Sequence, residues 1–260
     1  MNSGSEIWVQ VIAALHLLKT DPAGLKGAVF RVRTGPVRDS LAKEIRKLAG
    51  PVTRLHPNMS DEQLFGGIDV VATLQSGDLK ATKGLFDRHG WFELTMAERC
   101  GLHTAARISQ ALDQRQICSL IVFDEGIDDE KLPDSLKERL AFYFDLSELA
   151  YSDTDFPEIE TLSEKSQPFT TSQTDIQTLV LLANEFGISS ARAPQLALAA
   201  AKANAMANGR QELSAEDLEI AVELVYPSRA TQIPQEPTQE ESTPEQETQP
   251  EQNQDQETSD

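Results

Sequence analysis

The chain has 260 residues, with 42 acidic and 23 basic side chains, and its formal net charge is −19. This acidity argues against nucleic-acid and anionic-membrane partners, because phosphate groups must be met by a basic surface. No apolar run approaches the ~18 residues of a membrane span, and the N-terminus lacks the basic region and cleavage site of a signal peptide. Cys100 and Cys118 cannot form a disulfide framework, so the sequence favours a reducing, cytoplasmic setting.

The first 150 residues alternate between helix-like and strand-like segments. Apolar residues at helical spacing predict helices over 7–19, 37–48, 100–113 and 134–142. Short apolar or alternating runs predict strands over 28–32, 52–55, 90–95 and 117–123. This alternation is typical of an α/β fold with a mostly parallel sheet.

After Pro168 the pattern becomes helical, with periodic segments over 171–186, 193–208 and 214–225. Ser214 and Asp217 form an N-terminal capping signal for the last of them. From Pro227 to Asp260 the chain is rich in proline and glutamine and carries a net charge of −8. The sequence therefore predicts an α/β domain over 1–167, a helical domain over 168–226 and a disordered acidic tail over 227–260.

The turn after the first predicted strand reads Arg33-Thr-Gly-Pro-Val-Arg-Asp-Ser40. A phosphate-binding P-loop at this place needs glycines, a lysine and a Ser or Thr hydroxyl for Mg²⁺. Gly35 is kept and Arg38 could replace the lysine, but Asp39 stands at the hydroxyl position and Pro36 lacks an N–H donor. The turn is thus a degenerate phosphate cradle.

A second candidate is the run from Leu120 to Glu125, LIVFDE, which is like a strand with a metal-holding Asp124 and a water-orienting Glu125. The alternative is a buried strand that ends in an acidic loop. A metal site is not expected, because the four histidines are scattered without ligand spacing. No G-x-S-x-G motif of a serine hydrolase is present.

In order along the chain, several stretches resemble the AAA+ module of the magnesium chelatase D subunit. Leu64-Phe-Gly-Gly-Ile-Asp69, followed by Gly84-Leu-Phe86, is similar to a β-hairpin insertion of the chelatase I subunit, here placed near 64–90. Residues 130–140, EKLPDSLKERL, are similar to its arginine-finger segment, and 188–198, ISSARAPQLAL, to its sensor-2 helix. The acidic tail matches the linker of D subunits.

The resemblance implies an AAA+-type P-loop-like sheet followed by a small helical lid. It places the family's metal-binding strand at 90–96, with Thr95 and Met96 at the acidic positions, and moves Asp124 to the sensor-1 strand. Arg139 then matches an arginine finger acting on a neighbouring subunit, and Arg192 matches sensor 2, facing the nucleotide. Gly35, Arg38 and Asp39 remain as the P-loop remnant.

As a family member the chain is expected to be a non-hydrolysing ring subunit of magnesium chelatase. Its partners would be the ATPase I subunit and the porphyrin-binding H subunit, in ATP-driven insertion of Mg²⁺ into protoporphyrin IX. ATP and Mg²⁺ would be used by the complex, with no cofactor tightly bound to this chain. No D-x-S-x-S motif of an integrin-I domain occurs, which indicates an N-terminal portion of a D subunit.

Two other hypotheses stay open at this point. The chain could be an active AAA+ ATPase of another family that uses Asp124 and Glu125. It could also be a non-catalytic interaction protein with no role in metal insertion.

Overall fold

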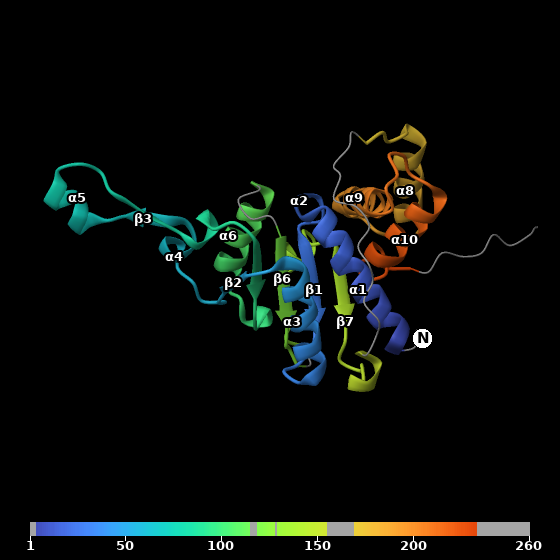
Figure 1. Cartoon of the computed structure of the whole chain (residues 1–260), viewed down its shortest axis with the longest axis horizontal. Coiled ribbons are helices and arrows are strands. Elements are labelled where there is room, and N and C mark those ends of the chain that lie inside the picture. Colours follow the sequence, from blue (N-terminus) through green and yellow to red (C-terminus); the bar gives the residue numbers. More distant parts are fainter. Residues whose placement is uncertain (1–3, 115–118, 128, 155–168, 233–260) are drawn as a thin grey trace, which may run out of the picture.

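The computed structural model describes residues 4–114, 119–127, 129–154 and 169–232. A sheet of five parallel strands, in the order β2-β5-β6-β1-β7, forms the centre of the α/β part. The helical part lies beside the β7 edge, and a long arm projects beyond the opposite edge (Figure 1). The five strands are β1 (Gly27–Arg31), β2 (Val52–Leu55), β5 (Trp91–Leu94), β6 (Ser119–Asp124) and β7 (Phe142–Asp145).

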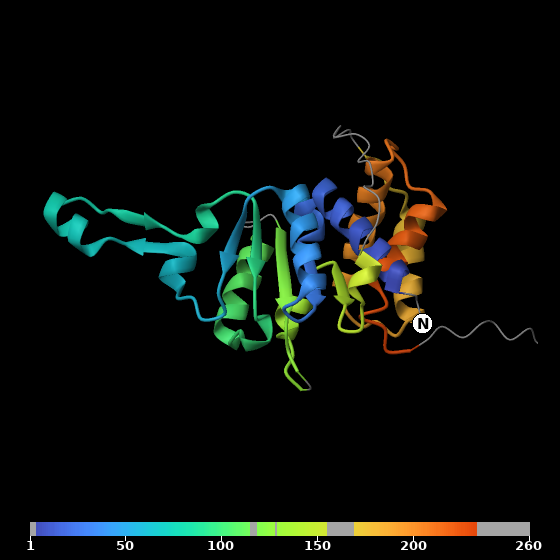
Figure 2. The same ribbon diagram turned by 60° about the horizontal axis from the view of Figure 1, so that its bottom comes forward.

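Helices cover both faces of this sheet, because alternate residues of its central strands are apolar on each side. Ala28 and Phe30 of β1 pack with α1 (Gly4–Thr20) and α3 (Pro36–Ala49) in one core. Val29 packs with α6 (Leu102–Asp113) in a second core on the other face. Figure 2 shows α3 in front of the sheet and α6 behind it.

The predicted helix over 134–142 is wrong in its second half. Helix α7 covers only Asp134–Lys137, and Phe142–Asp145 form strand β7 beside β1. Phe142 and Phe144 are buried on one side of this strand, and Phe144 stacks on Phe30 at 5.9 Å. The alternating burial of Phe-Tyr-Phe outweighs the helical propensity of the preceding residues.

One close backbone approach fixes where β1 begins. Short helix α2 (Pro22–Leu25) ends at Lys26, which adopts a left-handed conformation with φ of 62°. Gly27 follows with φ of 145°, and a Cβ at this residue would collide with the carbonyl oxygen of Leu120 in β6. Glycine is therefore required at 27, and Lys26 is held at the amino end of the sheet.

The arm is an insertion between β2 and β5. It contains α4 (Asp61–Phe65), the antiparallel pair β3 (Gly66–Ile68) and β4 (Ala81–Lys83), and α5 (Val70–Ser76) near its tip. The base is anchored by Leu64 and Phe86 in the second core. The outer half exposes large apolar side chains, namely Ile68, Val70, Val71, Leu74 and Leu79.

The helical part consists of α8 (Gln173–Glu185), α9 (Arg192–Ala207) and α10 (Ala215–Val225). Small side chains let α9 pack closely against α10 and against α1 and α2 of the sheet domain. Its buried alanines are Ala193, Ala197, Ala200, Ala201, Ala203 and Ala205. The short helices η1 (Leu85–Asp87), η2 (Ala97–Arg99) and η3 (Tyr151–Thr154) complete the described elements.

Asp217 is a fully buried carboxylate at the start of α10. It accepts hydrogen bonds from the backbone and hydroxyl of Ser214, from Asn204 Nδ2 at 2.7 Å and from Arg210 Nη2 at 2.6 Å. We expect Asp217→Asn to lower the free energy of unfolding by about 2 kcal/mol, because an amide places donors against donors. Urea unfolding measures this change, with the exposed first-turn Glu216→Gln as control; equal midpoints for the two variants would contradict it.

Residues 227–232 pack against the rest of the molecule, although the sequence predicts a disordered tail from Pro227. Arg229 donates to the carbonyl oxygens of Leu140, Ala141 and Val225. Thr231 donates to the carbonyl oxygen of Gly187 at 2.8 Å. The rest of the predicted tail, 233–260, and the predicted boundary at 167 lie outside the described residues.

Candidate functional site

The degenerate P-loop lies at the carboxyl end of β1, where the chain enters α3. Gly35 is the N-cap of α3 without a side-chain capping bond, and Pro36 occupies its first position. Arg38 and Asp39 follow in the first turn, and Asp39 is exposed. The structure therefore brings all three remnant residues, Gly35, Arg38 and Asp39, to the place where a P-loop would stand.

The protein's own side chains occupy this place. Arg38 Nη1 lies 2.6 Å from Glu125 Oε1, and the other carboxylate oxygen of Glu125 accepts from Thr34 Oγ1 at 3.1 Å. The Arg38 guanidinium also stacks on the ring of Phe123, with 4.6 Å between its carbon and the ring centroid. Glu125 thus provides the anion that a nucleotide phosphate would otherwise supply to Arg38.

Asp124 is similarly engaged. It is only 2% exposed, lies 3.7 Å from Arg31 Nη1 and accepts from the backbone of Gly126 at 3.0 Å. The backbone N–H of Glu125 donates to Glu98, whose side chain is 2% exposed. Both carboxylates of the LIVFDE run are therefore ion-pair partners within the chain, Asp124 buried and Glu125 partly exposed.

The residues present do not fit the phosphates of a nucleotide. A proline replaces one of the N–H donors of the cradle, and an internal carboxylate already pairs with its remaining cation. Among the described residues no group of three His, Cys, Asp or Glu side chains could hold a metal ion. The carboxyl edge of the sheet therefore carries a closed salt-bridge network.

A different cluster lies at the amino edge of the sheet. Lys26 directly precedes β1, Asp113 ends the helix before β6, and Arg139 lies just before β7. Arg192 joins them from the first position of α9. Since the strands are parallel, this cluster and the P-loop remnant lie at opposite edges of the same sheet.

Asp113 is the common partner of the three cations. Its Oδ2 lies 2.9 Å from Arg139 Nε and 2.8 Å from Arg139 Nη2. Its Oδ1 lies 3.2 Å from Lys26 Nζ and 3.6 Å from Arg192 Nη1. Partial burial would raise the pKa of Asp113, but the hydrogen bonds from Arg139 and Lys26 hold it below the ordinary value. Three cations share one carboxylate, so the cluster keeps a net positive charge.

Arg139 is well fixed within this cluster. Besides Asp113, its Nη1 donates to the carbonyl oxygen of Ser135 at 2.8 Å, one turn earlier. The side chain remains 18% exposed, so part of it reaches solvent. A fixed and partly exposed guanidinium can bind an oxyanion from outside the chain.

Arg192 does not lie at the nucleotide pocket of its own chain. The resemblance predicts a sensor-2 residue that faces the nucleotide, but the structure brings Arg192 to Arg139 at the opposite edge. Helix α9 begins at Arg192, whose backbone N–H donates to Ser190 Oγ at 3.4 Å, and Pro194 in the same turn has no N–H. Arg139 and Arg192 can therefore serve one ligand together.

Sequence reasoning did not select Lys26 or Asp113. Both lie at element ends, and Asp113 is 87 residues from Lys26 and 26 from Arg139. The signal that could have found Lys26 is the Lys-Gly pair before a strand, which places a cation at the amino edge. Asp113 gives only a weak signal in the sequence. It is a single acid at a helix C-terminus, a position where the helix dipole disfavours negative charge.

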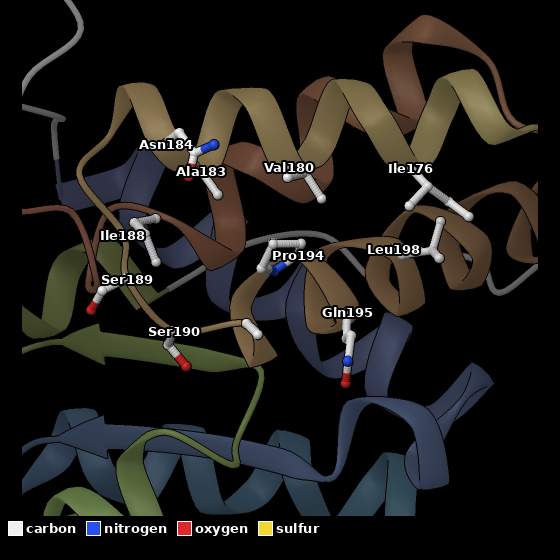
Figure 3. Close-up of a pocket in the computed structure, with 11 residues that line it drawn as sticks. Ile176, Val180, Ala183, Asn184, Ile188, Ser189, Ser190, Pro194, Gln195 and Leu198 are labelled. Carbon is white, nitrogen blue, oxygen red and sulfur yellow. The ribbon is translucent and has the colours of Figure 1, made fainter.

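The lid also contains a groove of about 430 Å³ between α8 and α9. Ile176, Val180 and Leu198 line one end of it, and Ser189 and Ser190 lie at the other (Figure 3). Its walls are mostly apolar and hold no charged side chain. Nothing in its chemistry suits a catalytic role.

The helical part of the chain matches a known domain family. The AAA lid domain family matches residues 176–252. Among solved structures, a putative ATPase from Cytophaga hutchinsonii superposes with a TM-score of 0.57 at 14% identity, covering 86% of both chains. An MCM homologue from Methanopyrus kandleri gives the same TM-score and identity over 85% of this chain and 55% of its own. These likenesses show the AAA-type fold.

Sequence relatives are closer. The chain is 40% identical over 239 residues to the magnesium-chelatase 60 kDa subunit of Cereibacter sphaeroides, covering 90% of this chain and 43% of that protein. The Rhodobacter capsulatus 60 kDa subunit is 39% identical, covering 86% and 41%. The Chlorobaculum tepidum 67 kDa subunit is 25% identical, covering 88% and 43%. The chain thus spans about two fifths of the length of these relatives.

Proposed function

We propose, from the premise that this chain is a homologue of the magnesium-chelatase 60 kDa subunits, that it acts as the AAA+-like, non-hydrolysing part of a magnesium chelatase. In this role it forms a ring platform with an ATP-hydrolysing I subunit. The H subunit holds protoporphyrin IX, and Mg²⁺ is the second substrate. The reaction belongs to chlorophyll or bacteriochlorophyll biosynthesis.

The observation that carries the proposal is the contrast between the two edges of the sheet. At the carboxyl edge, Arg38 and Glu125 neutralise one another where a nucleotide would bind. At the amino edge, Arg139 and Arg192 keep an excess of positive charge around Asp113. A module of this kind lacks a working nucleotide site but can complete the site of a neighbour.

In this mechanism Arg139 is the finger that meets the γ-phosphate bound by the adjacent I subunit. A fixed guanidinium there offsets the charge that develops on the transferred phosphoryl group. Arg192, from the lid, approaches the same phosphates. Gly35, Arg38 and Asp39 hold no phosphate in this proposal and keep only a structural role.

The chain alone should lack ATPase activity. We expect purified protein to hydrolyse ATP no faster than the buffer does, and Glu125→Gln to leave that rate unchanged, because Glu125 is an ion-pair partner of Arg38. The measurement is phosphate release at saturating ATP and Mg²⁺. Measurable hydrolysis that Glu125→Gln abolishes would instead support an active ATPase that uses Asp124 and Glu125.

The proposal as a whole is tested by reconstitution. The full chain is mixed with I and H subunits, protoporphyrin IX, ATP and Mg²⁺, and the Mg-porphyrin product is followed by fluorescence. Because the chain spans about two fifths of its relatives, stimulation of ATP hydrolysis by the I subunit is followed as well. No binding to the I subunit would support the alternative of an unrelated interaction protein.

Setting and cofactors belong to the same proposal. No helix in the described part of the chain is long and apolar enough to cross a membrane. We place the complex in the cytoplasm, and we assign ATP and Mg²⁺ to the complex, with no tightly bound cofactor in this chain. The net charge of −19 disfavours nucleic acid as a partner.

A further inference from the structure

Asp113 gathers cations that reach it from three separate parts of the fold. Lys26 comes from the end of α2, Arg139 from the segment after α7, and Arg192 from the lid helix α9. All three lie within 3.6 Å of its two carboxylate oxygens. Without that carboxylate, three like charges on long side chains would repel one another and separate.

The Arg139 guanidinium keeps N–H donors that its partners in the chain do not use. A guanidinium has five N–H donors. Asp113 Oδ2 accepts from Nε and lies 2.8 Å from Nη2, and the Ser135 carbonyl accepts from Nη1. Among the described residues the remaining hydrogens of Nη1 and Nη2 have no partner. Nη1 and Nη2 are the two terminal nitrogens of the fork, and such a pair can bind two oxygens of one phosphate.

We propose that Asp113 is a positioning residue that sets the Arg139 fork and gathers Lys26 and Arg192 beside it, so that the three cations meet the terminal phosphates of a nucleotide held by a neighbouring subunit. This inference rests on the proposed function and adds two residues to it. Asp113 acts through Arg139, whereas Lys26 contacts the phosphates directly.

The charge count supports an incoming polyanion as the ligand. Lys26, Arg139 and Arg192 outnumber the single carboxylate of Asp113 by two. Lys26 is 23% exposed and Arg192 is 41% exposed. Both are therefore free enough to turn from Asp113 toward an arriving phosphate.

The test uses the full chain mixed with the partner ATPase. Asp113→Asn is expected to lower the kcat of stimulated ATP hydrolysis about 10- to 100-fold, since a misplaced catalytic group costs this much. The KM for ATP should change less than twofold, because the partner's own pocket binds most of the nucleotide. Asp113→Glu, which keeps the charge, should restore most of the rate. Lys26→Met should lower kcat less than Asp113→Asn does.

The matched control is Asp61→Asn. Asp61 is also a partly exposed carboxylate that pairs with an arginine, Arg107, at 2.9 Å, but it lies at the base of the arm. It should leave both kcat and KM unchanged. Thermal unfolding of each variant, followed by circular dichroism, separates a loss of fold from a loss of positioning, and the surface change Lys26→Met tests the cluster even where Asp113→Asn unfolds.

The outcomes separate the two proposals. Full kcat for both Asp113→Asn and Lys26→Met, together with a loss for Arg139→Ala, overturns the role of Asp113 and leaves the proposed function standing. If Arg139→Ala also leaves the kcat of stimulated ATP hydrolysis unchanged, the proposed function itself is overturned. A selective fall in kcat that Asp113→Glu reverses supports the inference, because a merely structural carboxylate would not separate kcat from KM.

Discussion

Arg139→Ala is expected to abolish stimulation of the partner ATPase, with a fall in kcat of about 10³-fold or more. The physical reason is that a guanidinium fixed at the transition-state charge stabilises it without reorganisation, and alanine leaves that charge to water. Steady-state ATP hydrolysis by the mixed subunits measures the effect. Arg139→Lys should recover only a small part, because a single ammonium cannot replace the two-point contact.

The control for this prediction is Arg46→Ala. Arg46 is an exposed arginine in the last turn of α3 and is not one of the cations that pair with Asp113. It should leave stimulation unchanged. Binding of each variant to the partner is measured in parallel, since a lost complex also loses stimulation. Arg139→Ala that binds normally and stimulates fully would remove the trans-acting role.

Arg229→Met should lower the free energy of unfolding by about 2–4 kcal/mol. The Arg229 guanidinium donates to three carbonyl oxygens, of Leu140, Ala141 and Val225, at 2.5 to 3.1 Å. Methionine keeps much of the volume but leaves these oxygens without their donors. Burial lowers the pKa of Arg229 to about 10, so the side chain is still charged at neutral pH.

Urea and thermal unfolding measure this loss, and the midpoint temperature should fall by roughly 5–15 °C. Arg229→Lys keeps the charge but has fewer hydrogen-bond donors. Its unfolding midpoint should therefore lie between those of the wild type and the methionine variant. Because Leu140 and Ala141 directly follow Arg139, the same variant should also weaken stimulation of the partner. An unchanged unfolding midpoint would show that the three carbonyl contacts contribute little.

The sheet domain could be predicted well because its signals are local. Strands at 28–32 and 52–55 and helices at 37–48 and 100–113 follow from apolar spacing, and each lies within a few residues of the observed element. The sequence also predicts a broken phosphate cradle, since Pro36 and Asp39 stand at positions that require other chemistry, and the structure places both in the first turn of α3. What failed was β7, because its four residues are too short to carry a clear period.

The positive cluster could not be predicted as a unit. Its members come from residues 26, 113, 139 and 192, and only the convergence of three element ends and a lid helix brings them together. Sequence resemblance selected Arg139 and Arg192 separately, each for a different role. Composition misled at the tail, because the acidic, proline-rich segment hides Arg229, whose partners lie 88 and 89 residues earlier.

The opposed edges of the sheet give this module a direction. In a closed ring of head-to-tail contacts, every subunit presents two different surfaces to its two neighbours, and under the proposed function these are the two ends of the strands. Such a subunit supplies Arg139 to the nucleotide site of one neighbour and stimulates ATP hydrolysis there. At its other side the Arg38–Glu125 ion pair occupies its own nucleotide site, so the second neighbour has no ATP to act on. Under the proposed function, each copy of this chain therefore creates one interface without ATP hydrolysis. The number of interfaces that hydrolyse ATP equals the number of ATP-binding partners in the ring.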